Sequence, residues 1–185
     1  GQQNEAQATL QMGLENDAED AELLALVGLS KLQGGDITSG ITGLEHALQV
    51  NPKNLTLRTE LAKAYISADE TEHAIQQLQA ILVEGGEEQQ TKKLLVTAYL
   101  RAKNFDQAIN AALEMLTNNP KDPSVLTLVG NVFIASDDKT EARKYFIQAL
   151  QIKPKFVPAT ISLARLEEMG NHYAEATALY KVPGK

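Results

Sequence analysis

The sequence predicts an all-α protein made of repeated pairs of antiparallel helices, and three observations support this prediction. The 185 residues are 43% hydrophobic but only 5% aromatic, with no tryptophan, so aliphatic residues supply most of the apolar surface. Leu, Ala, Ile and Val in this proportion favour helices packed on helices. Proline and small residues recur at a fixed interval, and between them apolar residues follow the three-to-four spacing of helices.

The interval equals the step from Pro120 to Pro154, and three separate ladders of positions share it. Pro52 lies two such intervals before Pro120, and Gly86 occupies the vacant midpoint. Small residues and aliphatic residues keep the same period, which indicates structural repetition. The small ladder is Ala6, Gly40, Ala74, Ala108, Ala142 and Ala176, and the aliphatic ladders are Val27, Leu61, Leu95, Val129 and Leu163, and Leu48, Leu82, Leu116 and Leu150.

Each repeat is predicted to contain two helices joined by a tight turn. Residues 123–156 show helical spacing in two segments, with Asp137-Asp138 between them. Asp122-Pro123 suits a helix start, because Asp can cap the helix and Pro at the first helical position loses no hydrogen bond. Gly34-Gly35-Asp36 and Ala102-Lys103-Asn104 are the expected turns of other repeats, and proline closes the repeats because it cannot continue a helix.

Small residues inside the predicted helices indicate close packing. Gly28 and Gly130 would each cost about 1 kcal/mol in an isolated helix relative to alanine. We expect close approach of two helices at these places to compensate for that cost. Tyr65, Tyr99 and Phe133 are expected to fill the space beside the crossings, which is a structural role rather than a ligand-binding one.

These residues resemble the tetratricopeptide repeat, whose unit of about 34 residues carries a Leu-Gly pair, an aromatic residue, alanines in the second helix and a closing proline. The resemblance implies a right-handed superhelical α-solenoid of antiparallel helix pairs. Residues 123–156 match every signature place with Leu126, Val129-Gly130, Phe133, Ala142, Phe146, Ala149 and Pro154. The departures are local: they are Lys31 and Glu167 in the aromatic place, Gly86 in the proline place, and Ala112 and Met115 in the second helix of residues 89–122.

The resemblance covers nearly the full chain as a single array. We expect a partial repeat at 1–20 with a lone second helix near Gln3 to Glu15, full repeats at 21–54, 55–88, 89–122 and 123–156, and a partial repeat at 157–185. Solenoids normally end in polar capping elements. Leu179, Tyr180 and Val182 instead give this chain an apolar end. We therefore expect a segment of a longer array, with neighbouring repeats of the full-length chain as its contacts.

A narrower resemblance concerns the junctions between repeats. Residues 52–62 and 154–166 look like the long bacterial tetratricopeptide lipoproteins associated with exosortase (PEP-CTERM) and exopolysaccharide systems. This resemblance implies a periplasmic or outer-membrane-attached scaffold, and without it a cytoplasmic protein is expected. The lipobox cysteine of a lipoprotein is not in this sequence, which contains no cysteine.

The family resemblance implies that the first helix of each repeat lines a concave binding groove. Four of the candidate side chains are basic and one is acidic in a chain of net charge −7, so we expect an anionic or carbonyl-rich extended segment as the partner. The alternative is an ordinary solvated helix face. Of the carboxylate-clamp pattern for chaperone tails only Lys93 is present. The candidates, here called the groove residues, are Leu29, Thr59, Glu60, Lys63, Lys93, Thr97, Arg101, Thr127, Asn131 and Arg165.

The sequence indicates no catalytic residue, no cofactor and no metal site. His46, His73 and His172 have no partner at zinc-binding spacing, and the glycine-rich nucleotide and nucleophile motifs are absent. The negative net charge argues against nucleic acid, whose phosphates need concentrated Lys and Arg. No apolar stretch approaches the roughly 20 residues that span a bilayer.

We therefore predict a non-enzymatic scaffold that binds a protein or peptide through its concave groove. Two alternatives are an architectural spacer or oligomerisation segment, and an accessory array of an enzyme that lies outside this sequence.

Overall fold

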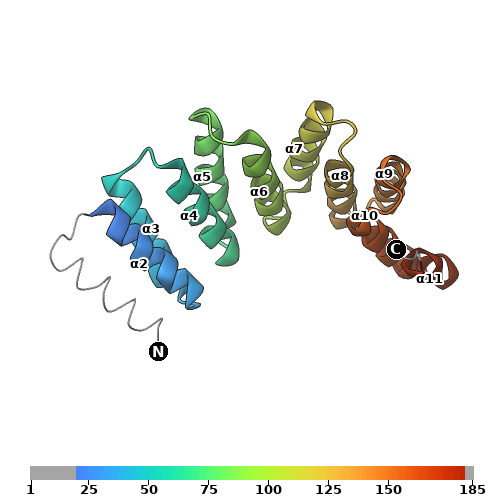
Figure 1. Ribbon diagram of the computed structural model, residues 1–185, viewed down its shortest axis with the longest axis horizontal. Helices are drawn as coiled ribbons and strands as arrows, with labels where there is room; N and C mark the ends of the chain where they lie inside the picture. Colours follow the sequence, from blue (N-terminus) through green and yellow to red (C-terminus); the bar gives the residue numbers. More distant parts are fainter. Residues whose placement is uncertain (1–19, 182–185) are drawn as a thin grey trace. The chain divides into compact units, whose positions relative to one another are not determined.

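The computed structural model describes residues 20–181 (Figure 1). All regular structure in this range is helical, which confirms the all-α prediction. The helix expected near Gln3 to Glu15, Ala6 of the small ladder, and Val182 lie outside the described residues. The chain divides into two compact units, residues 1–102 and residues 103–185.

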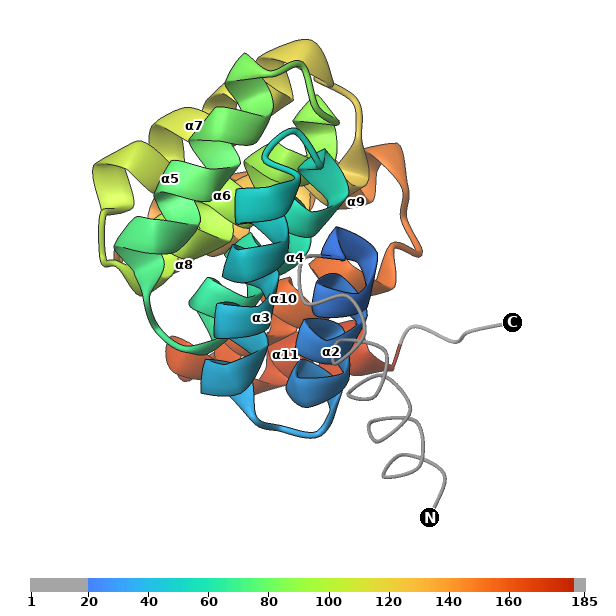
Figure 2. The ribbon, with the colours of Figure 1, turned by 90° about the vertical axis from the view of Figure 1, so that its left-hand side faces the viewer.

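In the described part of the first unit, α2 and α3 pack side by side as an antiparallel pair (Figure 2), and α4 and α5 form the next pair. Helix α6 packs on α5 and also contacts α4. Leu44, Leu61, Leu78 and Ile81 lie fully buried between these helices. The helices are α2 (Ala21–Gln33), α3 (Ile37–Val50), α4 (Leu55–Ser67), α5 (Thr71–Val83) and α6 (Glu88–Arg101).

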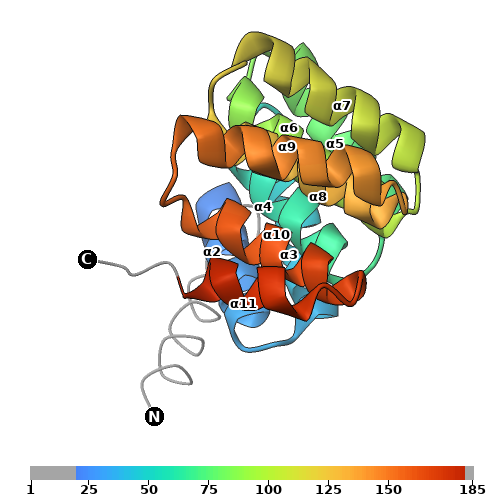
Figure 3. The same ribbon diagram turned by 90° about the vertical axis from the view of Figure 1, so that its right-hand side faces the viewer.

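The second unit repeats this arrangement. Helices α8 and α9 form one pair, α10 and α11 form another (Figure 3), and α7 packs on α8. Asp122 caps α8 as predicted, since its carboxylate accepts a hydrogen bond from the backbone N–H of Ser124 at 2.7 Å. The helices are α7 (Phe105–Asn118), α8 (Pro123–Ala135), α9 (Lys139–Ile152), α10 (Val157–Met169) and α11 (Tyr173–Tyr180).

The turn before each of α3, α5, α7, α9 and α11 contains one residue with left-handed backbone, and this residue recurs at the interval of the repeat. Such a residue ends a helix because the next N–H turns back to the last helical carbonyls. The Asp138 N–H, for example, donates to the carbonyl of Phe133 at 2.8 Å. The left-handed residues are Gly35, Asp69, Lys103, Asp137 and Asn171, with φ between 58° and 84°.

Among these left-handed residues, Lys103 is the least suited to its position, because a lysine side chain forms no local hydrogen bond that would offset the left-handed conformation. We expect Lys103→Gly to stabilise the protein by about 0.5–1 kcal/mol. Urea unfolding followed by circular dichroism measures this gain. The control is Lys121→Gly, at an exposed turn position without positive φ. Glycine there only loosens the unfolded chain, so a loss is expected. Similar effects at both positions would contradict the explanation.

The junctions between pairs are of two kinds. Pro120 occupies the second place of a turn that the Asp122 N–H closes on the Asn119 carbonyl at 3.2 Å, and Pro52 and Pro154 stand in equivalent turns. At Gly86 the helix end is different, because the Gly86 N–H donates to the Ile81 carbonyl at 2.9 Å and Gly85 has φ of 78°. A Cβ at Gly86 would lie 2.3 Å from the Ile81 side chain. A glycine-terminated helix therefore replaces the proline turn.

Gly28 and Gly130 are small for different reasons. A Cβ on Gly28 would lie 3.0 Å from backbone atoms of Gly40 and Leu44, so two helix backbones approach there as expected. A Cβ on Gly130 would lie 2.4 Å from the ring of Phe146. At Gly130 the nearest atoms therefore belong to a large side chain of α9 rather than to a neighbouring backbone.

Tyr65 and Phe133 have the structural role that the sequence predicts. Tyr65 is buried, and its hydroxyl donates to the carboxylate of Glu45. Burial and, second, this hydrogen bond raise the pKa of Tyr65, because both favour the neutral phenol. Phe133 stacks on Tyr145 with ring centroids 5.5 Å apart.

Candidate functional site

The groove residues divide between the two units. In the first unit, Leu29 lies on α2, Thr59, Glu60 and Lys63 lie on α4, and Lys93, Thr97 and Arg101 lie on α6. In the second unit, Thr127 and Asn131 lie on α8 and Arg165 lies on α10. Helices α4 and α6 contact each other, as do α8 and α10. The α4 and α6 residues therefore lie on two contacting helices of the first unit, and the last three lie on two contacting helices of the second.

The threonines among these residues cannot donate hydrogen bonds to a partner. The hydroxyls of Thr59, Thr97 and Thr127 donate to the carbonyl four residues earlier in their own helix, at 2.8, 3.0 and 2.7 Å. Thr127 is also only 4% exposed. It is therefore a packing residue, whereas Thr59 and Thr97 keep a free acceptor.

Among the groove residues of the first unit, the unpaired positive charges lie on α6. On α4, the Lys63 ammonium lies 2.7 Å from the Glu60 carboxylate, so this pair adds little net charge. Within residues 20–181, Lys93 and Arg101 have no ion pair, and Arg101 is exposed. Lys93, Thr97 and Arg101 follow one another at four-residue spacing, which places them along one face of α6. This face is the strongest candidate for an anion-seeking surface in the first unit.

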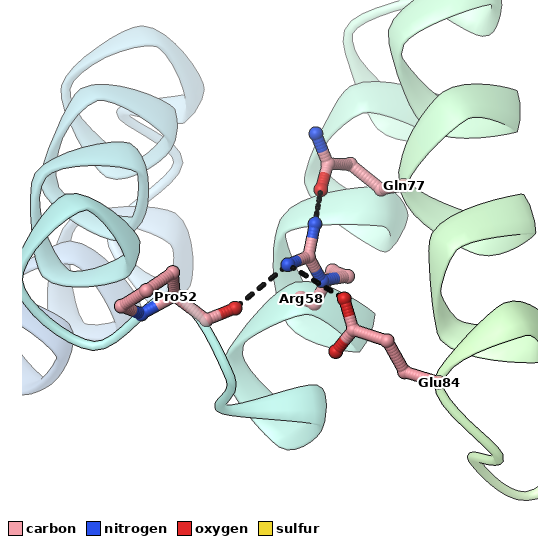
Figure 4. A network of polar contacts seen from close by, with 4 residues as sticks. All are labelled: Pro52, Arg58, Gln77 and Glu84. Atoms are coloured by element: carbon pink, nitrogen blue, oxygen red, sulfur yellow. Dashed lines mark hydrogen bonds and ion pairs between the residues drawn. The ribbon is translucent and has the colours of Figure 1, made fainter.

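Arg58 on α4 is a structural residue that the sequence analysis missed (Figure 4). Its guanidinium donates to the Gln77 side chain at 3.0 Å and to the Pro52 carbonyl at 2.7 Å, and it lies 3.5 Å from Glu84. The signal was available, because the equivalent positions one repeat earlier and two repeats later, Leu24 and Leu126, are apolar. Arg58 thereby holds the junction between α3 and α4 in place.

That junction forms one wall of an open hollow of about 460 Å³ between α2 and α4, here called the α2–α4 hollow. It lies on the face of the groove residues, because Ala25 and Leu29 occupy the repeat positions of Lys93 and Thr97. Only Leu29 was a candidate from the sequence. The hollow is lined by Asp20, Ala21, Glu22, Ala25, Leu26, Leu29, Asn51, Asn54 and Leu57.

Two polar residues of the hollow are held by capping bonds. A carboxylate oxygen of Asp20 accepts from the backbone N–H groups of Glu22 and Leu23, at 2.8 and 3.1 Å. The Asn54 side-chain oxygen accepts from the Leu57 N–H at 3.1 Å, which leaves its amide nitrogen able to donate. The rim of the hollow is therefore ordered before any partner arrives.

A buried carboxylate takes the aromatic place in the second unit. Glu167 on α10 is 3% exposed, and it accepts from the Arg143 guanidinium and from His172 Nδ1, the latter at 2.9 Å. Arg143 comes from α9 and His172 from the turn before α11. The cluster borders a hollow of about 240 Å³, but the Glu167 carboxylate is already paired with the Arg143 guanidinium. We assign it a structural role.

The described residues contain no group of three or more His, Asp and Glu side chains that could hold a metal ion. None of the helices in residues 20–181 is long and apolar enough to cross a membrane.

Two family profiles described as "Tetratricopeptide repeat" match residues 31–95 and 93–155. Together they cover more than half of the chain. The chain belongs to the tetratricopeptide repeat (TPR) family. This membership confirms the family and fold class that the sequence predicts.

Two curated relatives match this TPR chain along most of its length but are longer proteins. The human protein O-mannosyl-transferase TMTC1 is 24% identical over 168 residues, which is 89% of this chain and 19% of the relative. The peroxisomal targeting signal receptor of Eremothecium gossypii is 23% identical over 221 aligned residues, which is 98% of this chain and 39% of the relative. The chain thus spans well under half of either protein.

Solved TPR structures share the fold. A tetratricopeptide repeat protein from Parabacteroides merdae aligns with a TM-score of 0.82 and 20% identity, over 96% of this chain and 70% of its own. A MamA structure aligns with a TM-score of 0.67 and 21% identity, over 89% and 90%. YrrB, described as a TPR protein with an unusual peptide-binding site, aligns at 0.62 and 14%, over 92% and 88%.

Proposed function

We propose that this TPR protein is a non-enzymatic scaffold that binds an extended, acidic segment of a partner protein across the face formed by α4 and α6. The observation that carries the proposal is the pair of unpaired cations, Lys93 and Arg101, on one face of α6. They stand out in a chain of net charge −7. Long-range attraction between such cations and a carboxylate-bearing segment would speed its encounter with this face.

The chemistry of the face favours an extended segment rather than a small molecule. The cations are about 12 Å apart along the helix, since eight residues separate them at 1.5 Å each. That distance matches about four residues of extended chain. The peptide-binding site named for YrrB and the signal-receptor function named for the peroxisomal relative support peptide binding by this fold.

The triple variant Lys63→Ala, Lys93→Ala, Arg101→Ala tests the proposal. With a labelled, acetylated and amidated peptide of alternating glutamate and alanine as probe, fluorescence anisotropy should show at least about tenfold weaker binding, because charge pairs of about 1 kcal/mol are lost. Binding by the unaltered protein should also weaken with added salt. The variant should keep its helical circular dichroism.

A matched control removes the same charge elsewhere. Lys53, Lys121 and Lys155 each follow a junction proline and are exposed. If their triple replacement by alanine weakens peptide binding as much as the groove variant does, only net charge is responsible and the proposal fails. If the unaltered protein binds no acidic peptide, the architectural spacer becomes the better explanation.

The alternative of an accessory array has one observation in its favour. The relative TMTC1 is named as a mannosyltransferase, and this chain matches only 19% of its length. An array of this kind would serve an enzyme whose catalytic part lies elsewhere. A full reading frame that encodes a catalytic domain would favour this alternative.

The narrower resemblance to exosortase-associated lipoproteins stays a prediction from residues 52–62 and 154–166. It predicts a lipobox upstream of this segment and polysaccharide-export genes beside the gene. A reading frame with neither feature would remove the periplasmic or outer-membrane assignment.

A further inference from the structure

The α2–α4 hollow has an apolar floor and an acidic rim. The floor consists of Ala25, Leu26, Leu29 and Leu57, and Leu26 is 44% exposed. An exposed apolar surface beside polar groups is typical of a place where another chain docks.

The charged residues around the floor of the hollow are all acidic. Asp20 and Glu22 are the charged residues that line the hollow, Glu22 is exposed, and no Lys or Arg is among the lining residues described. Asn51 and Asn54 supply amide groups at the same rim. The first unit thus has an acidic, apolar hollow at α2 and unpaired cations at α6.

We propose that this hollow binds a lysine side chain of the partner segment. The acidic residues of the same segment bind Lys93 and Arg101 on α6. The aliphatic stem of lysine fits the floor and its ammonium reaches Glu22 and Asp20, because lysine buries its methylenes while its charge stays in water. The Asn54 amide nitrogen can donate to a carbonyl of the segment. This inference rests on the proposed function, and it adds the second feature of the partner sequence.

The geometry of the unit also sets the spacing within that sequence. Helix α4 contacts α6, so their axes lie about 10 Å apart, and the α2–α4 hollow lies on the other side of α4, about one further helix spacing away (Figure 1). The hollow is therefore about 20 Å from α6. An extended chain covers that distance in about six residues. The partner therefore carries a lysine about six residues from its acidic residues.

Three labelled peptides of about twelve residues, with blocked ends, test the inference. The first has a lysine six residues from a pair of glutamates, the second has the lysine only two residues away, and the third has norleucine in place of the distant lysine. The first should bind the unaltered protein about fivefold more tightly than either of the others, which corresponds to about 1 kcal/mol for a partly screened charge pair. This advantage should disappear in Glu22→Gln.

Two controls make the outcome specific. Glu175→Gln also removes an exposed first-turn glutamate, but from α11, and should leave all three affinities unchanged. Leu26→Asn should weaken the lysine and norleucine peptides alike, since both lose the floor. If all three peptides bind equally and only the groove variant weakens them, the hollow inference is overturned and the proposed function stands. If none binds, both fail.

Discussion

We expect Gly130→Ala to lower the free energy of unfolding when residue 146 is Phe and to raise it when residue 146 is Ala. In the unaltered protein the added Cβ would lie 2.4 Å from the Phe146 ring, which is fully buried and cannot move aside, so we expect a loss of about 1–3 kcal/mol. Phe146→Ala should cost about 3–5 kcal/mol through the cavity it leaves. In that background Gly130→Ala should instead stabilise by about 1 kcal/mol, because alanine favours the helix.

Urea unfolding of the four proteins measures these differences, provided that the denaturant slope is unchanged. The matched control is Gly28→Ala, where the added Cβ meets backbone atoms at 3.0 Å. Removing a side chain by Leu44→Ala does not relieve that contact, so Gly28→Ala should be destabilising in both backgrounds. A stabilising Gly130→Ala in the presence of Phe146 would disprove the explanation.

The second large effect is expected at the buried carboxylate of α10. Arg143→Met leaves Glu167 buried with only His172 beside it, so the free energy of unfolding should fall by about 2 kcal/mol. This value lies below the usual cost of breaking a buried pair because the Arg143 side chain is 45% exposed. Adding Glu167→Met should recover most of the loss, since two apolar side chains need no partner.

Lys144→Met is the control on the same helix. Its ammonium lies 3.1 Å from Glu141, but both side chains are exposed, so the variant should change stability by less than about 1 kcal/mol. An equal cost for Arg143→Met and Lys144→Met would show that the burial of Glu167 has no energetic consequence. A double variant that stays as unstable as Arg143→Met would show that packing, not charge, is responsible.

The ladders of small and aliphatic residues predicted the helices well, because the helical repeat depends on spacing along the chain. A repeat contacts mainly its neighbours, so every repeat encodes the same buried faces and the same turns. The left-handed turn residues were within this reach, since Gly35 and Asn171 are typical of that conformation. The positive φ of Lys103 could not be predicted in this way, because lysine is not typical of left-handed backbone.

The candidate site was less predictable. A position in the sequence indicates the helix face on which a side chain lies, but it does not indicate the partners of its hydrogen bonds and ion pairs. Thr127 was placed correctly on α8 but is buried, and its hydroxyl is occupied within the helix. Lys63 is one of the four basic candidates, but its charge is paired with Glu60. The sequence also gives no signal for the partners of Arg58 and Glu167, whose bonds connect separate helices.

The sequence alone determined the helical repeat, the family and the positions of the turns, since these follow from local spacing and from the chemistry of proline and glycine. Only the tertiary structure decided which charges stay unpaired, why Gly130 must be small, and where α2, α4 and the α3–α4 junction line an open hollow. The physical reason is that these features depend on distances between side chains of different helices, and those distances are fixed only when the helices pack.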